Sequence, residues 1–479
     1  MEFITSNKGA RKLCYEGFTY TKKKSSKTTV RWECSLRISQ QCKGALITDI
    51  NESVVRYTTD HTHEADRFSV EAMKVRADIK ATVQANRGKP GQIVTDKLSK
   101  VPKEVVAAAG RIDSLKRVVR RAKRGTAPPE PASMRDIPHP IPEEYSTRND
   151  KSFLVYDNGE ETSRILVYAS DDGLKLLDQA DTWFMDGTHS TAPPQFPQLF
   201  CLRVPLGESC VSVAYALLPS KRQEVYEECL TAILDTCLAK DIRPNPTRVI
   251  VDFEVAIHNA VRSVLAADIH IQGCFYHLTQ STWRHVQAEG LQTLYKSDEE
   301  VRTFCGMLDA LAFLPVTDVS KGMRALKDAA PDSLHGLVEY FDSNYVTGQY
   351  RAVMCDNGQM RFRRTSPRFE LAIWNVHEAT MMGKHRTNNM CESWNNGFKH
   401  LVGHNNPSLW TVIDCLGKDA AMVEADIYRH SRGEQAPKRR KKTTVLHQNR
   451  LKSLCQHYLD GEKTLAQFLY AMGQCIRLN

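Results

Sequence analysis

Long hydrophobic runs are missing from this sequence of 479 residues. No apolar stretch reaches the roughly 18 residues that a membrane-spanning helix needs, so we expect neither a membrane span nor a membrane partner. Residues 1–6 contain no basic residue and no long apolar region, and a signal peptide is therefore not expected. The 14 cysteines are scattered singly, which excludes a disulfide scaffold and indicates reduced thiols with room for one metal site.

Positive charge is concentrated in the first third of the chain. Residues 1–150 contain 29 Lys and Arg against 18 Asp and Glu, whereas the remainder contains 36 against 38. A localised basic region is the electrostatic footprint of nucleic-acid binding, although a solubilising surface has the same composition. The length predicts about three domains, and 41% apolar residues are enough for a sizeable core.

Residues 1–65 have the pattern of a small β-rich module. Strands are expected over residues 13–20, 29–34, 45–48 and 54–57. So short a unit buries little apolar surface, and it needs a covalent or metal cross-link. Two thiolates and two imidazoles can close a tetrahedral zinc site, and the module offers one such set: Cys34, Cys42, His61 and His63.

This module resembles a FLYWCH zinc finger over about residues 3–63. The residues that carry the resemblance stand in the family's order: Phe3, Leu13, Tyr20, Trp32, Cys34, Cys42, His61 and His63. The resemblance implies that the two Cys and two His bind structural Zn²⁺ and that the module binds DNA or protein. Cys14 lies outside the pattern, and we expect it to be a buried thiol.

Residues 66–124 change to a helical period. Three helices are expected: one that begins near Ser69, a short one around residues 93–98, and one over about residues 103–123. The last is strongly basic and includes Arg120 and Arg121, so the region forms either a helix-turn-helix-like DNA-binding unit or a solvated spacer. Residues 125–149 are rich in proline and predict an extended linker.

Three acidic residues follow or lie within buried elements after residue 150. Residues 183–185 and 249–251 are short apolar runs that end at Asp186 and Asp252, as buried strands do. Glu392 lies in a predicted helix that places four apolar residues along one side: Met390, Trp394, Phe398 and Leu401. Three such carboxylates can bind two divalent cations for phosphoryl chemistry; alternatively each is a helix cap or a surface group.

The order of elements around these acids is that of an RNase H-like α/β fold. Strands are expected over residues 164–168, 182–186, 199–205 and 210–218, followed by a helix over 221–238, a strand ending at 252, a helix over 255–266 and a strand over 269–275. In that fold the first and fourth central strands bring their aspartates together. The long gap before Glu392 implies a mostly helical insertion over about residues 280–385.

Residues 150–410 also resemble the MULE (Mutator-like element) transposase domain. The motifs that carry the resemblance come in the family's order: Asp186-Gly-Thr with Pro193 and Gln198-Leu-Phe, Leu217-Leu-Pro-Ser-Lys221, Asp252-Phe-Glu-Val-Ala256, Gly273-Cys-Phe-Tyr-His277, Trp374-Asn375, and Arg386-Thr-Asn-Asn389 with Glu392. The resemblance implies a DDE recombinase in which Asp186, Asp252 and Glu392 hold Mg²⁺ or Mn²⁺ at the scissile phosphate.

Other residues carry weaker signals. Cys274 and His277 form a C-x-x-H motif at a strand end, which is either half of a second zinc site, a DNA-proximal or active-site-shaping pair, or a core Cys with a hydrogen-bonded His. Lys399 and His400 follow Glu392 by about two turns and either contact phosphate or lie on a solvated face.

The C-terminal region, residues 411–479, is expected to be helical. A helix over residues 408–430 has these core candidates: Trp410, Val412, Ile413, Leu416 and Met422. The basic run 435–442 indicates a nuclear localisation signal, a phosphate-contacting loop or a solvated charge run.

Together these patterns predict a nuclear DDE-type transposase that cleaves the ends of a mobile element and joins them to target DNA. Its partners are double-stranded DNA and, because two ends are cut together, further copies of the chain as a dimer or larger assembly. Two alternatives remain: a domesticated DNA-binding regulator that does not cut, and a nuclease of the same fold without strand transfer.

Overall fold

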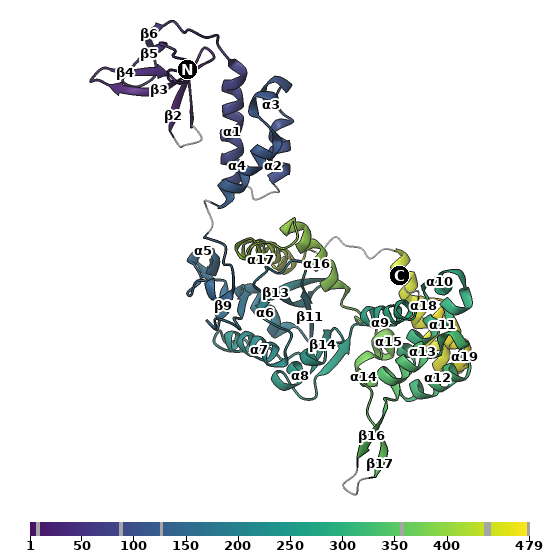
Figure 1. Cartoon of the computed structure of the whole chain (residues 1–479). Coiled ribbons are helices and arrows are strands. Elements are labelled where there is room, and N and C mark those ends of the chain that lie inside the picture. The colour runs from purple at the N-terminus through teal and green to yellow at the C-terminus, as the bar shows by residue number, and fades with distance from the viewer. Residues whose placement is uncertain (6–9, 86–89, 125–127, 355–358, 435–441, 477–479) are drawn as a thin grey trace. The chain divides into compact units, whose positions relative to one another are not determined.

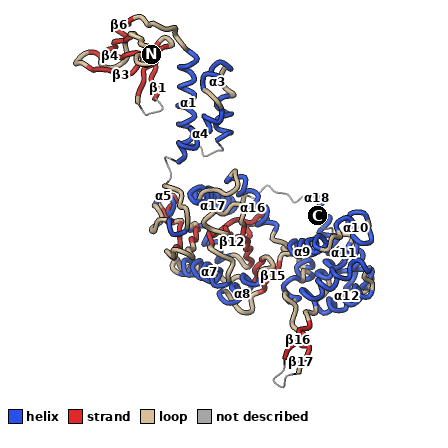
Figure 2. The backbone as a smooth tube through the Cα atoms, in the orientation of Figure 1, coloured by secondary structure: helices blue, strands red, loops and turns tan. Residues whose placement is uncertain are grey.

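The computed structural model describes residues 1–5, 10–85, 90–124, 128–354, 359–434 and 442–476. The chain divides into two compact units, Met1–Glu130 and Pro131–Asn479 (Figure 1). The first unit holds a β-rich sheet and a group of helices, and the second is mixed α/β with a helical C-terminal region (Figure 2). Within the described ranges, no helix is long and apolar enough to cross a membrane.

The first unit opens with an antiparallel sheet of six strands in sequential order. Its strands are β1 (Glu2–Thr5), β2 (Arg11–Tyr15), β3 (Phe18–Ser25), β4 (Thr29–Cys34), β5 (Ala45–Asp49) and β6 (Val55–Thr59). The single strand expected over residues 13–20 is two strands, because Glu16 and Gly17 adopt positive φ angles of 47° and 82° and turn the chain. A small core of Leu13, Tyr20 and Trp32 lies beneath the sheet.

Four helices follow, where three were expected. They are α1 (Arg67–Ala85), α2 (Pro90–Leu98), α3 (Lys103–Ala109) and α4 (Ile112–Arg124). Gly110, at φ 90°, separates α3 from α4. The first helix begins before Ser69, because Asp66 Oδ1 accepts a hydrogen bond of 2.8 Å from the Ser69 amide and so caps the helix. Arg120 and Arg121 lie exposed on α4.

The second unit is built on a seven-stranded sheet in the order β15-β14-β11-β12-β13-β10-β9. The strands are β9 (Leu154–Asp157), β10 (Leu166–Ala169), β11 (Thr182–Thr188), β12 (Gln198–Leu206), β13 (Ser209–Leu218), β14 (Arg248–Val251) and β15 (His270–Gly273). The central strand β11 pairs antiparallel with β12 and parallel with β14, which in turn pairs parallel with β15. The expected strands are therefore present in the expected order.

Helices cover this sheet. They are α6 (Asp171–Gln179), α7 (Gln223–Leu238), α8 (Val255–Val264), α16 (Asn389–Val402) and α17 (Leu409–Ser431). Two core expectations on these helices are wrong: Leu401 is 43% exposed and Met422 is 61% exposed. Val402 is buried in place of Leu401, because the side of α16 that faces the core passes through residue 402 and not through residue 401. The other core candidates on α17 are buried.

Part of the proline-rich segment packs against the second unit. Ile137, Ile141 and Tyr145 are buried, and the Tyr145 ring lies 4.6 Å from that of Trp410. The guanidinium of Arg164 donates to the carbonyl of Ile137 at 2.7 Å. The segment from residue 131 onward is therefore part of the α/β unit and is not an extended linker.

Helices also form most of the stretch between β15 and α16. They are α9 (Phe275–Ala288), α10 (Gln292–Ser297), α11 (Glu299–Ala310), α12 (Val316–Asp328), α13 (His335–Phe341), α14 (Leu371–Trp374) and α15 (His377–Met381). The C-terminal helices α18 (Lys442–Leu459) and α19 (Leu465–Gly473) share the same hydrophobic core. At Gly306 a Cβ would lie 2.4 Å from the carbonyl oxygen of Gly473, so α11 and α19 meet backbone to backbone.

A two-stranded ribbon interrupts the helical region. It consists of β16 (Tyr350–Met354) and β17 (Met360–Arg364), which pair only with each other in the described part of the chain. Figures 1 and 2 show it extending away from the helices that flank it. The sequence analysis did not anticipate this element.

One buried acid in the helical region gives a pH-dependence that can be measured. Asp309 is fully buried, and its Oδ1 accepts a hydrogen bond of 2.7 Å from the hydroxyl of Thr282. Burial raises the pKa of this carboxyl from 3.8 to about 7. The folded state therefore holds the proton more tightly than the unfolded state, and the stabilising contribution is lost as the pH rises between these values.

We expect the free energy of unfolding of the wild type to fall across this pH window relative to that of Asp309→Asn, by more than about 1 kcal/mol. The amide has no charge to bury at any pH, which is why its profile should be flatter. Urea unfolding of both proteins at several pH values measures the difference. Parallel pH profiles would contradict the expectation.

Candidate active site and zinc centre

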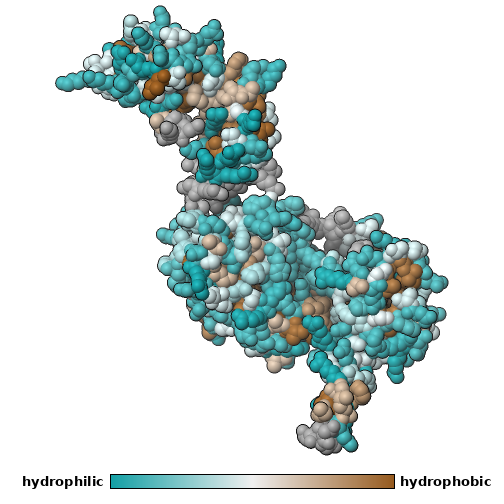
Figure 3. Space-filling model, viewed as in Figure 1, coloured by the Kyte–Doolittle hydropathy of each residue, from teal (hydrophilic) through white to brown (hydrophobic). Residues whose placement is uncertain are grey.

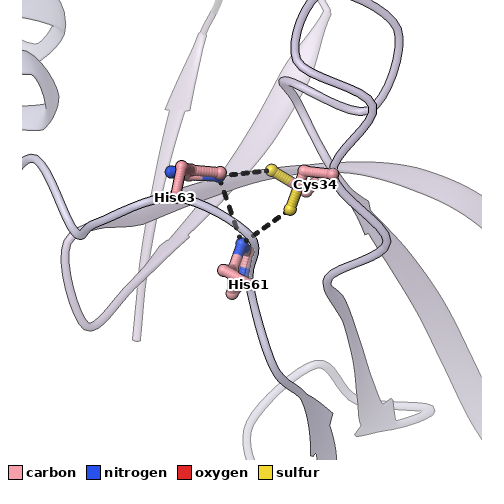
Figure 4. A group of neighbouring side chains, drawn as sticks. Cys34, His61 and His63 are labelled. Carbon is pink, nitrogen blue, oxygen red and sulfur yellow. Dashed lines mark hydrogen bonds between the residues drawn. The ribbon is translucent and has the colours of Figure 1, made fainter.

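The four residues predicted to bind zinc converge at the edge of the N-terminal sheet. Cys34 ends β4, Cys42 lies in the loop before β5, and His61 and His63 follow β6 (Figure 4). Three distances between their ligand atoms are 3.3 Å: Cys34 Sγ to His63 Nε2, Cys42 Sγ to His61 Nδ1, and His61 Nδ1 to His63 Nε2. A tetrahedral zinc ion with bonds of about 2.0–2.3 Å separates its ligand atoms by about 3.3–3.8 Å, so the group fits Zn²⁺.

Surrounding groups orient these ligands. The Tyr20 hydroxyl lies 2.8 Å from His61 Nε2, which leaves Nδ1 free to face the cysteines, and the Phe18 ring stacks on His61 at 3.8 Å. Burial opposes ionisation of Cys42, but hydrogen bonds from the backbone of Thr62 and Gly44 outweigh it and lower the pKa of this thiol to about 7. A thiolate is the form that binds metal, so the surroundings of Cys42 favour zinc binding, whereas burial raises the pKa of Cys34.

Two of the predicted catalytic acids stand on neighbouring parallel strands of the second unit. Asp186 lies on β11 and is only 8% exposed; its Oδ1 accepts a hydrogen bond from the Gly187 amide and its Oδ2 one from Asn395 Nδ2, at 2.8 and 2.7 Å. Asp252 directly follows β14. Since β11 and β14 are parallel and adjacent, both carboxylates lie toward the same edge of the sheet.

Glu392 and His277 complete the group. Glu392 is in the first turn of α16, and His277 is in the first turn of α9. His277 Nδ1 lies 2.7 Å from Asp252 Oδ1, and His277 Nε2 lies 3.7 Å from Glu392 Oε1. The imidazole therefore stands between two of the three acids, a placement that the C-x-x-H motif alone did not indicate.

The site concentrates negative charge in a partly buried place. Burial and the neighbouring Asp252 raise the pKa of Asp186 to about 7, and burial raises the pKa of Glu392. Burial also disfavours a charged His277, but Asp252 outweighs this effect and raises the pKa of the imidazole to about 11. Carboxylate oxygens are the ligands that hard divalent cations prefer, so these side chains are of the donor type that suits Mg²⁺ or Mn²⁺.

The acids are more widely spaced than the zinc ligands. Among the described residues, one group of three or more potential metal ligands has all its ligand atoms within 4.8 Å of one another. It consists of Cys34, Cys42, His61 and His63. Cys274 and His277 do not belong to such a group, so the structure provides no second zinc set among these residues.

Contacts at the start of α16 position Glu392. The buried Asn388 donates its amide N–H to Cys274 Sγ at 3.0 Å and its side-chain Nδ2 to the carbonyl of Met185 at 3.0 Å. These bonds join α16 to the start of α9 and to β11, the strand of Asp186. Cys274 thus acts as an acceptor in the core. Asn388 belongs to the Arg386–Asn389 motif but had no predicted role, and Asn395 was not among the predicted site residues.

The remaining candidates lie elsewhere. Lys399 and His400 are exposed on the last turns of α16, and Arg120 and Arg121 belong to the other unit. Glu254 does not cap α8 with its side chain; it accepts hydrogen bonds from Lys221 Nζ and Tyr226 Oη, each at 2.9 Å. The basic run 435–442 lies outside the described residues except for its last lysine, which begins α18.

Asn388→Ala should destabilise the second unit by about 1–3 kcal/mol, because the Met185 carbonyl loses its buried hydrogen-bond donor. Asn396→Ala, an exposed position on the same helix, is the matched control and should have little effect. Urea unfolding measures both variants. Equal stability of the two would show that Asn388 does not secure the start of α16.

Comparison with known protein families gives two matches. Residues 3–63 match the FLYWCH zinc finger domain, and residues 182–281 match the MULE transposase domain. Both predicted resemblances are thereby confirmed, in the predicted order. The matches support a transposase-type function, zinc binding by the N-terminal module and binding to DNA. No curated protein matches the chain.

The MULE match covers only part of the candidate site. It includes Asp186, Asp252 and His277 but ends before Glu392. The place of Glu392 beside the other residues therefore comes from the fold, through His277 and the contacts of α16.

Proposed function

We propose that this chain is a DDE-type DNA transposase, which cuts the ends of a mobile element in a metal-dependent reaction and transfers the cut strands into target DNA. The observation that carries the proposal is the convergence of Asp186, Asp252 and Glu392 on one edge of the sheet, with His277 between two of them. The match of residues 182–281 to the MULE transposase domain supports the same activity.

The topology of the sheet supports an RNase H-like core. Counting β11 as the first strand, the central order β13-β12-β11-β14-β15 reads 3-2-1-4-5, with the first three strands antiparallel and the last two parallel to the first. Asp186 on the first strand and Asp252 after the fourth then occupy the positions that this fold gives to its metal-binding acids.

In this proposal Asp186, Asp252 and Glu392 hold two divalent cations. Once bound there, the cations would supply Lewis-acid chemistry at the scissile phosphate. Asn395 orients the Asp186 carboxylate through its hydrogen bond of 2.7 Å. His277, whose imidazole lies between Asp252 and Glu392, orients these two side chains. No covalent link between protein and DNA is required.

The remaining expectations complete the proposal. Double-stranded DNA of the element's ends and of the target is the substrate, and the zinc module, Arg120, Arg121 and Lys399 are DNA-contact candidates. A dimer or larger assembly would bring two ends together, and such a protein acts in the nucleus. The structure holds one chain, so these points are part of the proposal.

The test is incubation of the full-length protein with DNA from the flanks of its own coding locus, in Mg²⁺ or Mn²⁺, with analysis of cut and joined products. Cutting at the element's ends followed by joining to a second DNA is the expected result. Cutting without preference for the ends and without joining would identify a nuclease of this fold. Tight binding without cutting would identify a DNA-binding regulator.

A further inference from the structure

The β16–β17 ribbon has an exposed surface with no described partner. Every residue of both strands is exposed. An isolated pair of strands is only marginally stable in water unless a third element or a ligand covers it. At the base of the ribbon, Gly348 has a φ of +79°, and a Cβ there would lie 1.9 Å from the Thr365 carbonyl oxygen. The two chain segments therefore meet backbone to backbone where the ribbon leaves the helical region.

One face of the ribbon is basic. Arg351 pairs with Arg363 across the strands, and Val353 pairs with Arg361. Directly paired residues project to the same side, so the three arginines lie on one face, and two of them are directly opposed. Like charges in that position repel, and none of the three forms an ion pair with a described residue. The strands themselves contain no acidic residue.

The other face is apolar. It carries Tyr350, Ala352 and Met354 on one strand and Met360 and Phe362 on the other, with Arg364 opposite Tyr350 at the base of the ribbon. Phe362 is 75% exposed, and Figure 3 shows exposed apolar side chains along this part of the molecule. Side chains of this kind are used by DNA-bending proteins to contact or wedge between bases.

Positive charge continues at the base of the ribbon. A groove of about 1060 Å³ lies between the base of the ribbon and the helices α12 and α13, and its charged lining residues are Arg324, Lys327, Arg364, Glu339 and Asp342. Lys327 is paired with Asp342, whereas Arg324 on α12 is exposed and forms no ion pair with a described residue. Basic groups therefore extend from the ribbon onto the helical region.

We propose that the β16–β17 ribbon is an arm that binds duplex DNA, with Arg351, Arg361 and Arg363 against the phosphates. Charge complementarity selects this partner: three guanidiniums on one face, none of which pairs with an acid among the described residues, suit a polyanion, and a two-stranded ribbon has the width that the major groove of DNA admits. The inference rests on the proposed function, since it gives a transposase a DNA contact beyond its acidic site.

The test compares two triple variants of the full-length protein. Arg351→Gln, Arg361→Gln and Arg363→Gln remove three charges from the ribbon. The matched control, Arg284→Gln, Lys321→Gln and Lys452→Gln, removes three charges from exposed positions on the helices of the same region. Affinity for a duplex from the flank of the coding locus is measured over a range of salt concentrations.

The ribbon variant should lower the slope of log affinity against log salt by about 3, since each phosphate contact contributes roughly one unit. The helix control should leave the slope unchanged. Replacing the same three arginines with lysine should retain the slope, which separates lost charge from a misfolded ribbon.

Each other outcome has a defined meaning. An unchanged slope in the ribbon variant, or an equal loss in the control, would overturn the proposal even if the protein cuts DNA. A change in oligomeric state with an unchanged slope would assign the ribbon to contacts between copies and also overturn it. If the slope falls as expected in the ribbon variant but the wild type never cuts DNA, the ribbon still binds DNA and the proposed transposase activity is wrong.

Discussion

Asp252→Asn is expected to lower the rate of metal-dependent DNA cleavage by about a hundred- to a thousand-fold or more. Asp252 follows the strand next to that of Asp186, and its Oδ1 lies 2.7 Å from His277 Nδ1. The amide keeps the shape of the side chain but has no charge with which to hold a divalent cation or the imidazolium. DNA binding should persist, because the substitution removes one acidic group and no basic one.

Glu254→Gln is the matched control for this prediction. It makes the same chemical change two residues away, but Glu254 is bonded to Lys221 and Tyr226 and not to the acidic group. Cleavage should therefore remain near the wild-type rate. Single-turnover cleavage of the flanking DNA, with binding measured separately, tests both variants. Cleavage that survives in Asp252→Asn, or that falls equally in Glu254→Gln, would show that the acids are assigned wrongly.

Removal of zinc is expected to unfold the N-terminal sheet. The core beneath the six strands is small, and its largest buried member is Trp32. Structural zinc contributes roughly 10 kcal/mol or more of apparent binding free energy in modules of this size, which is more than such a core supplies by itself. Cys42→Ser should lose the bound zinc and expose residues 3–63 to proteases while leaving the second unit folded.

Cys14→Ser provides the control for the zinc prediction. Cys14 is also buried, but it packs against Ile4, Val70 and Met73 and lies outside the ligand group. This variant should keep one zinc per chain and a protease-resistant module. Zinc stoichiometry and limited proteolysis of both variants decide the point. A folded, zinc-free Cys42→Ser protein would contradict the structural role of the metal.

Local patterns in the sequence were sufficient to predict much of both sites. Apolar runs that end in an acid pointed to Asp186 and Asp252, because a buried strand is visible as a short hydrophobic segment; Asp252 directly follows its strand, whereas β11 continues past Asp186 to Thr188. The four zinc ligands were recognisable since a small module without a large core requires a cross-link. Both predicted family resemblances were confirmed over residues 3–63 and 182–281.

Boundaries between helices and segments were harder to predict. The break at Gly110 requires a backbone angle that the helical periodicity of residues 103–123 does not show. The proline-rich composition of residues 131–149 indicated a linker, but Ile137, Ile141 and Tyr145 have apolar surfaces that the α/β unit buries. The β16–β17 ribbon does alternate between apolar and basic residues, but each strand has only five residues and none of them is buried, so this short pattern did not stand out within the expected helical insertion.

The sequence by itself singled out the candidate residues: three acids, the four zinc ligands and a C-x-x-H pair whose role it left open. Only the tertiary structure decided that His277 stands between Asp252 and Glu392, and that Asn388 ties α16 to Met185 and Cys274. It also placed α18 and α19 in the core of the helical region. The physical reason is that the contacts of Glu392 with His277 and of Asn388 with Met185 and Cys274 join residues more than a hundred positions apart. Local periodicity encodes which face of an element is buried but not which distant element covers it.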